Sequence, residues 1–304
     1  MIRVLVTGAR GQVGTEVARE LAGRAEVVAL DRASLDLGMK EDIAPRVRQA
    51  RPDVIVNCAA YTAVDRAESE PHTARAVNAI AAGILGEEAK RANALLVHFS
   101  TDYVFDGIKR APYIEDDPTH PLGVYGSTKL EGERAIEQSG CNHLILRTSW
   151  VYGPHGTNFM LTMLRLGEAR EELRVVDDQH GAPTSSRALA RALREVLDRD
   201  GDTDQLTRAE VEQVAERSGI YHASAGGETT WFGFAQAIFE EAQRQGRISR
   251  VPRLVAIPTR EYPTPAKRPA NSVLSCARLN ATFGVAIPDW RRGLEEALSA
   301  LPGR

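Results

Sequence analysis

The stretch that most limits how this chain can fold is a glycine-rich turn near its start. Residues 2–7 form a short, β-branched apolar run, and Gly8, Gly11 and Gly14 follow it before an amphipathic segment at residues 15–21. A strand, a glycine turn and a helix in this order form the pyrophosphate site of dinucleotide-binding folds. The first glycine permits the turn, the second lets the backbone approach the phosphates, and the third allows close packing of helix and strand. The sequence therefore predicts cofactor binding here, against the alternative of a purely structural loop.

Strands and helices alternate along the first half of the chain. The strands expected after the first are residues 27–30, 53–60, 95–100 and 143–148, and a helical pattern rich in alanine occupies residues 73–91. Such an alternation requires a largely parallel sheet with right-handed crossovers. We therefore predict an α/β fold: a Rossmann-like, doubly wound parallel sheet with a smaller C-terminal substrate-binding lobe.

The pattern becomes irregular after Pro154. Helices are expected at residues 158–166, 185–197, 231–245 and from about 290, with short strands at 173–176 and 219–223 and a charged surface insertion at 199–218. These elements are too irregular for a second independent Rossmann unit. We expect residues 1–153 to form an NAD(P)-binding Rossmann domain, to which later segments return. Residues 154–304 would then form mainly the substrate lobe, over the carboxyl edge of the sheet.

Acidic residues after the second strand bear on the choice of cofactor. Asp31 ends that strand, where a carboxylate can hold both hydroxyls of the adenosine ribose, which favours NAD. Arg32 follows it and Arg10 lies in the glycine turn, and either can meet the 2′-phosphate of NADP. Asp36 is expected near the adenine, or as a helix cap or turn residue. The residues leave NADH and NADPH both open.

Tyr125 and Lys129 are four residues apart in a segment with helical character, which we expect to end near Ser139 and Gly140. Residues at this spacing share one face of a helix, and an ammonium beside a phenol favours the phenolate. We therefore expect the pKa of Tyr125 to be lowered, as suits a general acid that protonates a carbonyl oxygen. A solvated lysine beside a half-buried tyrosine is the alternative, and only the surrounding motifs decide between them.

Polar residues stand at the end of the fourth expected strand. Ser100, Thr101 and Asp102 follow an apolar run, at the edge where doubly wound sheets bind ligands. We expect a hydroxyl from this group to face a substrate carbonyl, although ordinary turn chemistry would also use these residues. Asn78, within the alanine-rich helix, is expected to brace the backbone of the cofactor strands, or else to be exposed.

Composition excludes several classes of function. The formal net charge is −3 and no long basic run is present, so nucleic-acid binding has no electrostatic support. No window approaches the roughly 18–20 apolar residues of a membrane span, and the apolar start is too short for a signal peptide. Cys58, Cys141 and Cys276 lie far apart, which argues against a disulfide framework or a zinc site. We expect a cytoplasmic protein without nucleic-acid or membrane partners.

Seven segments together carry a resemblance to a known family. They are VTGARGQVG (6–14), NCAAYTAVDRAESEP (57–71), FSTDYVFDG (99–107), PLGVYGSTKLEGE (121–133), LRTSWVYG (146–153), DDQHGAPTS (177–185) and RPANSVL (268–274). Over nearly its whole length the chain resembles the dTDP-4-dehydrorhamnose reductases, which are extended short-chain dehydrogenases/reductases. The resemblance implies NADPH- or NADH-dependent reduction of the C4 ketone of dTDP-4-dehydro-6-deoxy-L-mannose. The product, dTDP-L-rhamnose, is a precursor of lipopolysaccharide and other surface polysaccharides.

The resemblance also assigns roles to individual residues. Tyr125 would donate the proton, and Lys129 would bind the nicotinamide ribose and lower the pKa of Tyr125. Thr101 would hydrogen-bond the substrate carbonyl with Asp102 beside it, and Trp150 would line the sugar pocket. The cofactor contacts, with those of the glycine turn, would be Gly8, Gly11, Gln12, Val13, Gly14, Asp31, Asp36, Leu37, Ala60, Tyr61, Thr62, Tyr125 and Lys129.

Several alternatives remain at this point. The regulatory subunit of methionine adenosyltransferase resembles the same family and binds a dinucleotide without a known need for turnover. A nucleotide-sugar dehydratase would want a glutamate after the acid at position 102, where this chain has Tyr103. Some relatives form homodimers with a divalent ion such as Mg²⁺ between acidic residues. We assign no residues to such a metal, and the oligomeric state and the nucleotide on the sugar stay open.

Overall fold

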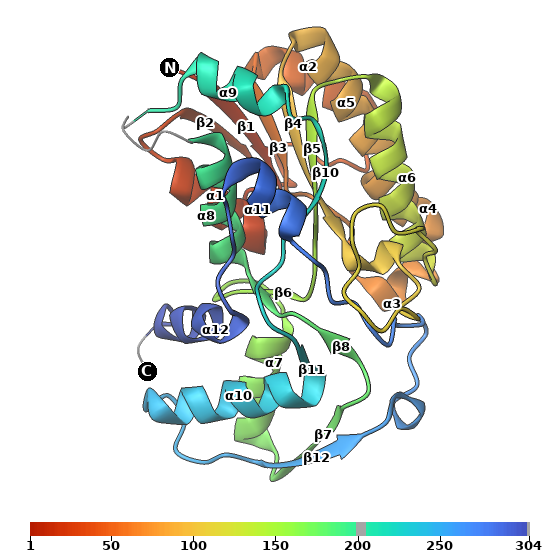
Figure 1. The fold of residues 1–304 in the computed structure, drawn as a ribbon, viewed down its shortest axis with the longest axis vertical. Coiled ribbons are helices and arrows are strands. Elements are labelled where there is room, and N and C mark those ends of the chain that lie inside the picture. The colour runs from red at the N-terminus through yellow and green to blue at the C-terminus, as the bar shows by residue number, and fades with distance from the viewer. Residues whose placement is uncertain (199–204, 303–304) are drawn as a thin grey trace.

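A parallel β-sheet forms the centre of the molecule (Figure 1). The computed structural model describes residues 1–198 and 205–302, and within them this sheet has six strands in the order β2-β1-β3-β4-β5-β10. The strands are β1 (Arg3–Thr7), β2 (Glu26–Leu30), β3 (Val54–Asn57), β4 (Leu95–Thr101), β5 (His143–Thr148) and β10 (Gly219–His222). All neighbouring pairs are parallel, as predicted. The third strand is shorter than expected, because residues 58–60 leave the sheet.

Helices cover both faces of this sheet, so the fold is doubly wound (Figure 1). One face carries α1 (Gln12–Leu21) and α8 (Ser186–Leu197), and the other carries α2 (Lys40–Ala50), α5 (Ala81–Ala92) and α6 (Val124–Ser139). Successive residues of a strand point to opposite faces. Val4 and Val54 therefore join one buried core, while Leu5 and Ile55 join the other.

Short helical pieces lie where the chain leaves β3 and β4. After β3 come α3 (Val64–Ala67), α4 (Pro71–Arg75) and a π-helical turn (Ala76–Ile80) that runs into α5. After β4 comes a 3₁₀ turn (Asp102–Val104). The helix predicted over residues 73–91 is therefore three consecutive segments, and the π-helical turn re-aims the residues within it.

The C-terminal lobe is built on short strand pairs and three helices. The pairs are β6 (Val151–Tyr152) with β9 (Thr184–Ser185), β7 (Glu172–Val176) with β12 (Arg253–Ile257), and β8 (His180–Gly181) with β11 (Thr229–Thr230). The helices are α7 (Phe159–Ala169), α10 (Trp231–Arg244) and α12 (Trp290–Ser299), and a 3₁₀ turn lies at Thr259–Glu261. Phe234 and Trp290 of this lobe belong to the same apolar core as Val4 of β1. The lobe thus packs as a continuation of the core on one face of the sheet.

The charged segment at residues 199–218 is not the surface insertion that the sequence suggested. Residues 199–204 lie outside the described residues, but α9 (Arg208–Ala215) packs on α8 and buries Val211 and Val214. The chain then returns to the sheet as β10, beside β5, and α11 (Ala277–Phe283) packs against β10. The spacing of Val211 and Val214, three residues apart, was the available signal for a packed helix.

Among the described residues, none of the helices has the length and apolar character that a membrane span needs.

Candidate active site

The glycine turn lies at the point where the sheet reverses its order. β2 and β3 flank β1 on opposite sides, and in such sheets ligands bind at the carboxyl ends of the strands next to this reversal. Gly8 has a φ of +65°, and a Cβ there would stand 2.8 Å from the Cα of Ala59. Gly11 precedes α1 without a side-chain cap, so the first N–H groups of that helix are open to an anion. These features fit a dinucleotide pyrophosphate.

Gly14 brings α1 onto the turn. A Cβ at this position would stand 2.2 Å from the carbonyl oxygen of Gly8, so no side chain fits without moving the backbone. We expect Gly14→Ala to weaken cofactor binding by at least about tenfold and to lower the melting temperature, because α1 must shift away from the pyrophosphate. Cofactor titration by fluorescence and thermal unfolding measure the two effects.

Gly219→Ala is the matched control, because the nearest atom to a Cβ there is 3.7 Å away. Equal affinities in Gly14→Ala and Gly219→Ala would show that the tight approach at Gly14 does not matter for binding.

The carboxylate of Asp31 is already engaged at the end of β2. It accepts hydrogen bonds from the Ser34 hydroxyl at 2.7 Å and backbone N–H at 3.0 Å, and these bonds lower its pKa. Arg10 pairs with it at 3.0 Å, while Arg32 pairs with Asp36 at 3.1 Å. Both guanidinium groups are more than four-fifths exposed. Two cations therefore stand beside the position expected for the adenosine ribose.

The remaining residues predicted to contact the cofactor differ in how far their side chains are exposed. Gln12 accepts a hydrogen bond from Asn158 at 2.9 Å, which ties α1 to the start of α7. Val13 and Ala60 are half-buried and Thr62 is exposed. Leu37 is packed in the core shared by the sheet and α2, so only its backbone is available to a ligand.

Asn78 braces the chain after β3, as predicted. Its side-chain oxygen accepts a hydrogen bond from the Tyr61 N–H at 2.8 Å, and its nitrogen donates to the Tyr61 carbonyl at 3.2 Å. The same nitrogen donates to the Thr128 hydroxyl on α6 at 3.1 Å. Asn78 is buried in the π-helical turn. It therefore links Tyr61 to the helix that carries Tyr125 and Lys129.

Tyr125 and Thr101 are brought together at the end of β4. The Thr101 hydroxyl hydrogen-bonds the phenol of Tyr125, and it also donates to Asp102 at 3.0 Å. Burial raises the pKa of Asp102 to about 6. The ring of Tyr103 packs edge-on against that of Tyr125, with 5.5 Å between centroids. The Thr101 hydroxyl and the Asp102 carboxyl thus act on the phenol, and Tyr103 packs against its ring.

The prediction that Lys129 lowers the pKa of Tyr125 is wrong for the chain as it stands. Burial raises that pKa to about 12, and the hydrogen bond with Thr101 offsets only part of the rise. The reason is that the ammonium of Lys129 is engaged elsewhere. Its Nζ donates to the Phe99 carbonyl at 2.6 Å and lies 3.0 Å from His98 Nε2. Lys129 is itself buried, which lowers its pKa to about 8.

Buried ionic contacts hold α6 against the sheet. Glu133, one turn after Lys129, pairs with Arg147 of β5 at 2.7 Å and accepts a hydrogen bond from Ser100. Glu68 accepts a hydrogen bond at 2.8 Å from the N–H of Val124, the first residue of α6. Ser100 therefore serves the attachment of α6 and does not face a ligand. Glu133 was not recognised from the sequence, since helical glutamates are usually solvated, and Glu68 lies in the turn after α3.

Trp150 stands where β5 leads into the lobe. Its φ is +48°, and its ring stacks on Trp231 of α10 with 3.6 Å between centroids and 5° between planes. Gly181 leaves room for this ring, because a Cβ there would stand 2.4 Å from it. Gln179 accepts a hydrogen bond from the indole of Trp231 at 3.2 Å. The loop at residues 177–185 thus fixes the tryptophan pair, and the partner Trp231 was not foreseen.

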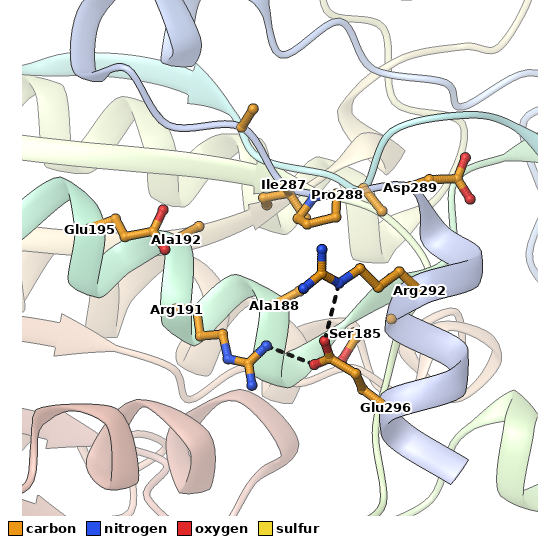
Figure 2. Close-up of a pocket in the computed structure, with 13 residues that line it drawn as sticks. Ser185, Ala188, Arg191, Ala192, Glu195, Ile287, Pro288, Asp289, Arg292 and Glu296 are labelled. Atoms are coloured by element: carbon orange, nitrogen blue, oxygen red, sulfur yellow. Dashed lines mark hydrogen bonds and ion pairs between the residues drawn. The ribbon is translucent and has the colours of Figure 1, made fainter. Parts of the chain in front are cut away.

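Another hollow lies away from these residues (Figure 2). It is bounded by α8, α12 and the segment before α12, and two arginines in it pair with one glutamate. Arg191 and Glu296 are 2.7 Å apart, and Arg292 lies 3.5 Å from Glu296. None of the predicted catalytic or cofactor residues lines it. We therefore take the carboxyl ends of β1, β3 and β4 as the candidate active site.

Comparison with known proteins decides the family. The family model described as the RmlD substrate binding domain matches residues 2–302. The dTDP-4-dehydrorhamnose reductase of Burkholderia thailandensis is 49% identical over 294 residues, which span 95% of this chain and 96% of the relative. The chain belongs to the dTDP-4-dehydrorhamnose reductase family. The reductase of Escherichia coli K12 is 42% identical and spans 99% of this chain and 98% of its own.

Solved structures agree with this family membership. The dTDP-4-dehydrorhamnose reductase of Bacillus anthracis, solved in complex with NADP, superposes with a TM-score of 0.88 at 34% identity. It covers 98% of this chain and 99% of its own. The UDP-glucose 4-epimerase of Thermus thermophilus, at 22% identity and a TM-score of 0.77, shares the fold.

The divalent ion that some members of the reductase family hold between acidic residues has no ligands assigned here. In residues 1–198 and 205–302, no group of three or more histidine, cysteine, aspartate or glutamate side chains is placed to hold an ion.

Proposed function

We propose that this chain reduces the C4 ketone of dTDP-4-dehydro-6-deoxy-L-mannose with NADPH, giving dTDP-L-rhamnose. The observation that carries the proposal is the hydrogen bond between Tyr125 and Thr101 at the end of β4, with Lys129 one turn later on α6, in a sheet that also carries an open glycine turn after β1. In this proposal residues 1–153, with β10, bind the cofactor, and residues 154–304 mainly bind the nucleotide sugar. The close relatives that share nearly the whole chain are named for the same reaction.

The proposed chemistry needs a hydride and a proton, and the bound nicotinamide supplies the hydride. The Thr101 hydroxyl, whose single proton goes to Asp102 in the structure, turns to donate to the C4 oxygen and so fixes the carbonyl beside Tyr125. Tyr125 then gives its proton to that oxygen as negative charge develops on it. A pKa of about 12 keeps the phenol protonated at neutral pH. A sugar alkoxide is more basic than a phenolate, so the transfer is still favourable.

Lys129 and Trp150 would complete the site. Lys129 binds the nicotinamide ribose and offers positive charge to the phenolate that Tyr125 leaves behind. Trp150, held by its stack on Trp231, presents a rigid aromatic wall to the deoxysugar. Desolvation around these groups strengthens their electrostatic effect on the transition state.

A coupled assay tests the proposal. The dTDP-4-keto sugar is supplied with NADPH, absorbance is followed at about 340 nm, a wavelength at which the reduced nicotinamide absorbs, and the product is identified. We expect stoichiometric loss of NADPH and formation of dTDP-L-rhamnose. Tight cofactor binding without turnover would contradict the proposal and favour a regulatory dinucleotide-binding role.

We further propose that NADPH is preferred over NADH. Ser34 and Arg10 occupy the Asp31 carboxylate that would hold the ribose hydroxyls, while two exposed guanidiniums are available to a 2′-phosphate. Replacing Arg10 by alanine should raise the KM for NADPH about tenfold, since one charge-assisted hydrogen bond is lost. The KM for NADH should change little or fall, because the carboxylate of Asp31 is released.

Steady-state kinetics with both cofactors measures this preference. Arg244→Ala is the control, since Arg244 is also mostly exposed but lies on α10 and pairs with Glu241. If Arg10→Ala raised both KM values alike, the phosphate role of Arg10 would be wrong.

We also propose that the reaction takes place in the cytoplasm. The three cysteines are free thiols, which suits a reducing compartment.

A further inference from the structure

His98 is a buried histidine that the mechanism so far leaves out, and its role rests on the reductase function proposed above. It lies in β4 with 1% of its surface exposed. Its Nε2 is 3.0 Å from Lys129 Nζ, and its Nδ1 is 2.9 Å from Asn57 Nδ2. Because both ring nitrogens are engaged, the two partners decide where the imidazole carries its proton.

His98 ends a polar row that crosses three neighbouring strands. Thr7 of β1 is the register partner of Asn57 in β3, which is the register partner of His98 in β4. Residues at matching positions of parallel strands point to the same face, and here that face is the one under α6. The Thr7 hydroxyl donates to Asn57 Oδ1 at 2.6 Å. The row therefore connects the residue before Gly8 with Lys129.

Which atoms of this row donate and which accept hydrogen bonds depends on the charge of Lys129. A charged Lys129 has three N–H donors and no acceptor. Phe99 takes one donor through its carbonyl, so His98 Nε2 must accept another. The neutral imidazole then carries its proton on Nδ1 and needs the amide oxygen of Asn57 opposite it. The amide nitrogen of Asn57 in turn donates to the Thr7 oxygen.

Turning the Asn57 amide over gives the complementary arrangement, which has the amide orientation seen in the structure, with Oδ1 toward Thr7 and Nδ2 toward His98. Its nitrogen then donates to His98 Nδ1, Nε2 carries the proton, and Lys129 must accept as a neutral amine. The two amide orientations occupy the same space. Each charge state of Lys129 thus has one complete set of hydrogen bonds.

We infer that His98 is a positioning residue that holds the Lys129 ammonium for the cofactor ribose, in a tautomer selected by Asn57 and Thr7. With two N–H groups of Lys129 held by His98 and Phe99, the third is left for a ribose hydroxyl. Because α6 carries both Lys129 and Tyr125, the same contact fixes the distance from the ribose to the proton donor.

A charged pair on α6 and β5 also lies near Lys129. Glu133, one turn later on α6, acts on the charge of Lys129 and is itself paired with Arg147 of β5. Burial lowers the pKa of Lys129 to about 8 and outweighs the opposite effect of Glu133. Burial also keeps the pKa of His98 well below its ordinary value. His98 is therefore neutral in the working pH range and can accept a hydrogen bond from the ammonium.

A pair of amide variants separates this role from a merely structural one. In His98→Gln, the side-chain oxygen can lie where Nε2 lies and so still accept a hydrogen bond from Lys129. In His98→Asn, the side chain can keep the contact with Asn57 but is too short to reach Lys129. The charged form of Lys129 is needed, so function is present below the pKa of Lys129 and is lost as pH rises through it. His98→Asn removes a bond to that charged form. The high-pH limb of the activity profile, where function is lost, should therefore move down by about one pH unit.

His98→Gln should keep the limb within a few tenths of a pH unit of the unmodified enzyme. The pH dependence is measured for kcat with the dTDP-4-keto sugar and, separately, for NADPH binding by fluorescence. His143→Asn, at the opposite end of the neighbouring strand β5, is the control and should leave both profiles unchanged.

The outcomes distinguish this inference from the proposed function. An unmodified enzyme without turnover contradicts the reductase proposal, while the binding profile still tests His98. Unchanged profiles in His98→Asn, or equal shifts in His98→Asn and His98→Gln, would overturn the inference. If His98→Asn does not fold, Asn57→Asp replaces it. A carboxylate there can only accept and adds negative charge, so the limb should move to higher pH, and no upward shift would contradict the inference.

Discussion

Tyr125→Phe is expected to lower kcat by a factor of about 10² to 10⁴ while leaving the affinity for NADPH within about twofold of the unmodified enzyme. The substitution removes the hydroxyl that hydrogen-bonds Thr101 and keeps the ring, which packs edge-on against Tyr103. Without the phenol, the oxyanion formed at C4 has no proton donor, and Thr101 alone must stabilise it. The loss therefore falls on the chemical step and not on cofactor binding.

The measurement is steady-state turnover with the dTDP-4-keto sugar, together with NADPH binding by fluorescence titration. Tyr221→Phe is the matched control, because Tyr221 lies on the far edge strand β10, where its hydroxyl donates to the Arg217 carbonyl at 2.7 Å. That variant should turn over normally. Near-normal turnover in Tyr125→Phe would show that a different group, with Asp102 the nearest acid, supplies the proton.

The pH dependence of turnover separates Tyr125 from Asp102 as the acid. A tyrosine with a pKa of about 12 stays protonated across the neutral range. An aspartic acid with a pKa of about 6 would lose its proton there. A rate that falls as pH rises through 6 would therefore favour Asp102.

Features that depend on residues close together in the sequence were predictable from it. The Gly8, Gly11 and Gly14 turn, the first five strands, and the helix that ends at Ser139 follow from short-range patterns of apolar residues and glycines. The family resemblance assigned Tyr125, Lys129 and Thr101 to one site. In the fold, Tyr125 and Lys129 share α6, and Thr101 contacts the Tyr125 phenol. The roles of individual residues stay predictions until the variants are measured.

Features that depend on packing between distant segments were not predictable. The row formed by Thr7, Asn57 and His98 exists only because three strands align in register, and no single segment encodes that alignment. The pKa of Tyr125 was predicted in the wrong direction because spacing along a helix says nothing about burial. A polar residue at the same point of successive apolar runs was the only signal, as in the segments VIVN and LLVHFS.

Arg147→Met is expected to reduce the free energy of unfolding by about 3–5 kcal/mol, which is the largest stability effect that we expect from one substitution here. Arg147 and Glu133 expose only 3% and 1% of their side chains, and two guanidinium nitrogens of Arg147 contact the carboxylate at distances from 2.7 to 3.2 Å. Methionine leaves Glu133 charged and buried without a cation. Denaturant titration gives the loss directly.

Arg75→Met is the matched control, since its glutamate partner lies on the same helix, α6, as Glu133. Arg75 pairs with Glu131 of α6, but 63% and 41% of these side chains are exposed. Exposed pairs contribute roughly 0–1 kcal/mol, so the control should unfold near the unmodified chain. A similar small loss in Arg147→Met would show that water reaches Glu133 when its partner is removed.

The double variant Glu133→Leu, Arg147→Met distinguishes two roles of the ion pair, its contribution to stability and its placement of α6. Replacing both partners of a buried pair by apolar residues is often neutral, so most of the lost stability should return. The ion pair also joins β5 to the helix turn after Lys129, and Ser100 of β4 contacts the same carboxylate. If stability returns while kcat stays low, the pair serves to hold Lys129 and Tyr125 in register with the sheet. Recovery of both would mean that apolar packing alone places α6, and that the ion pair is not required for catalysis.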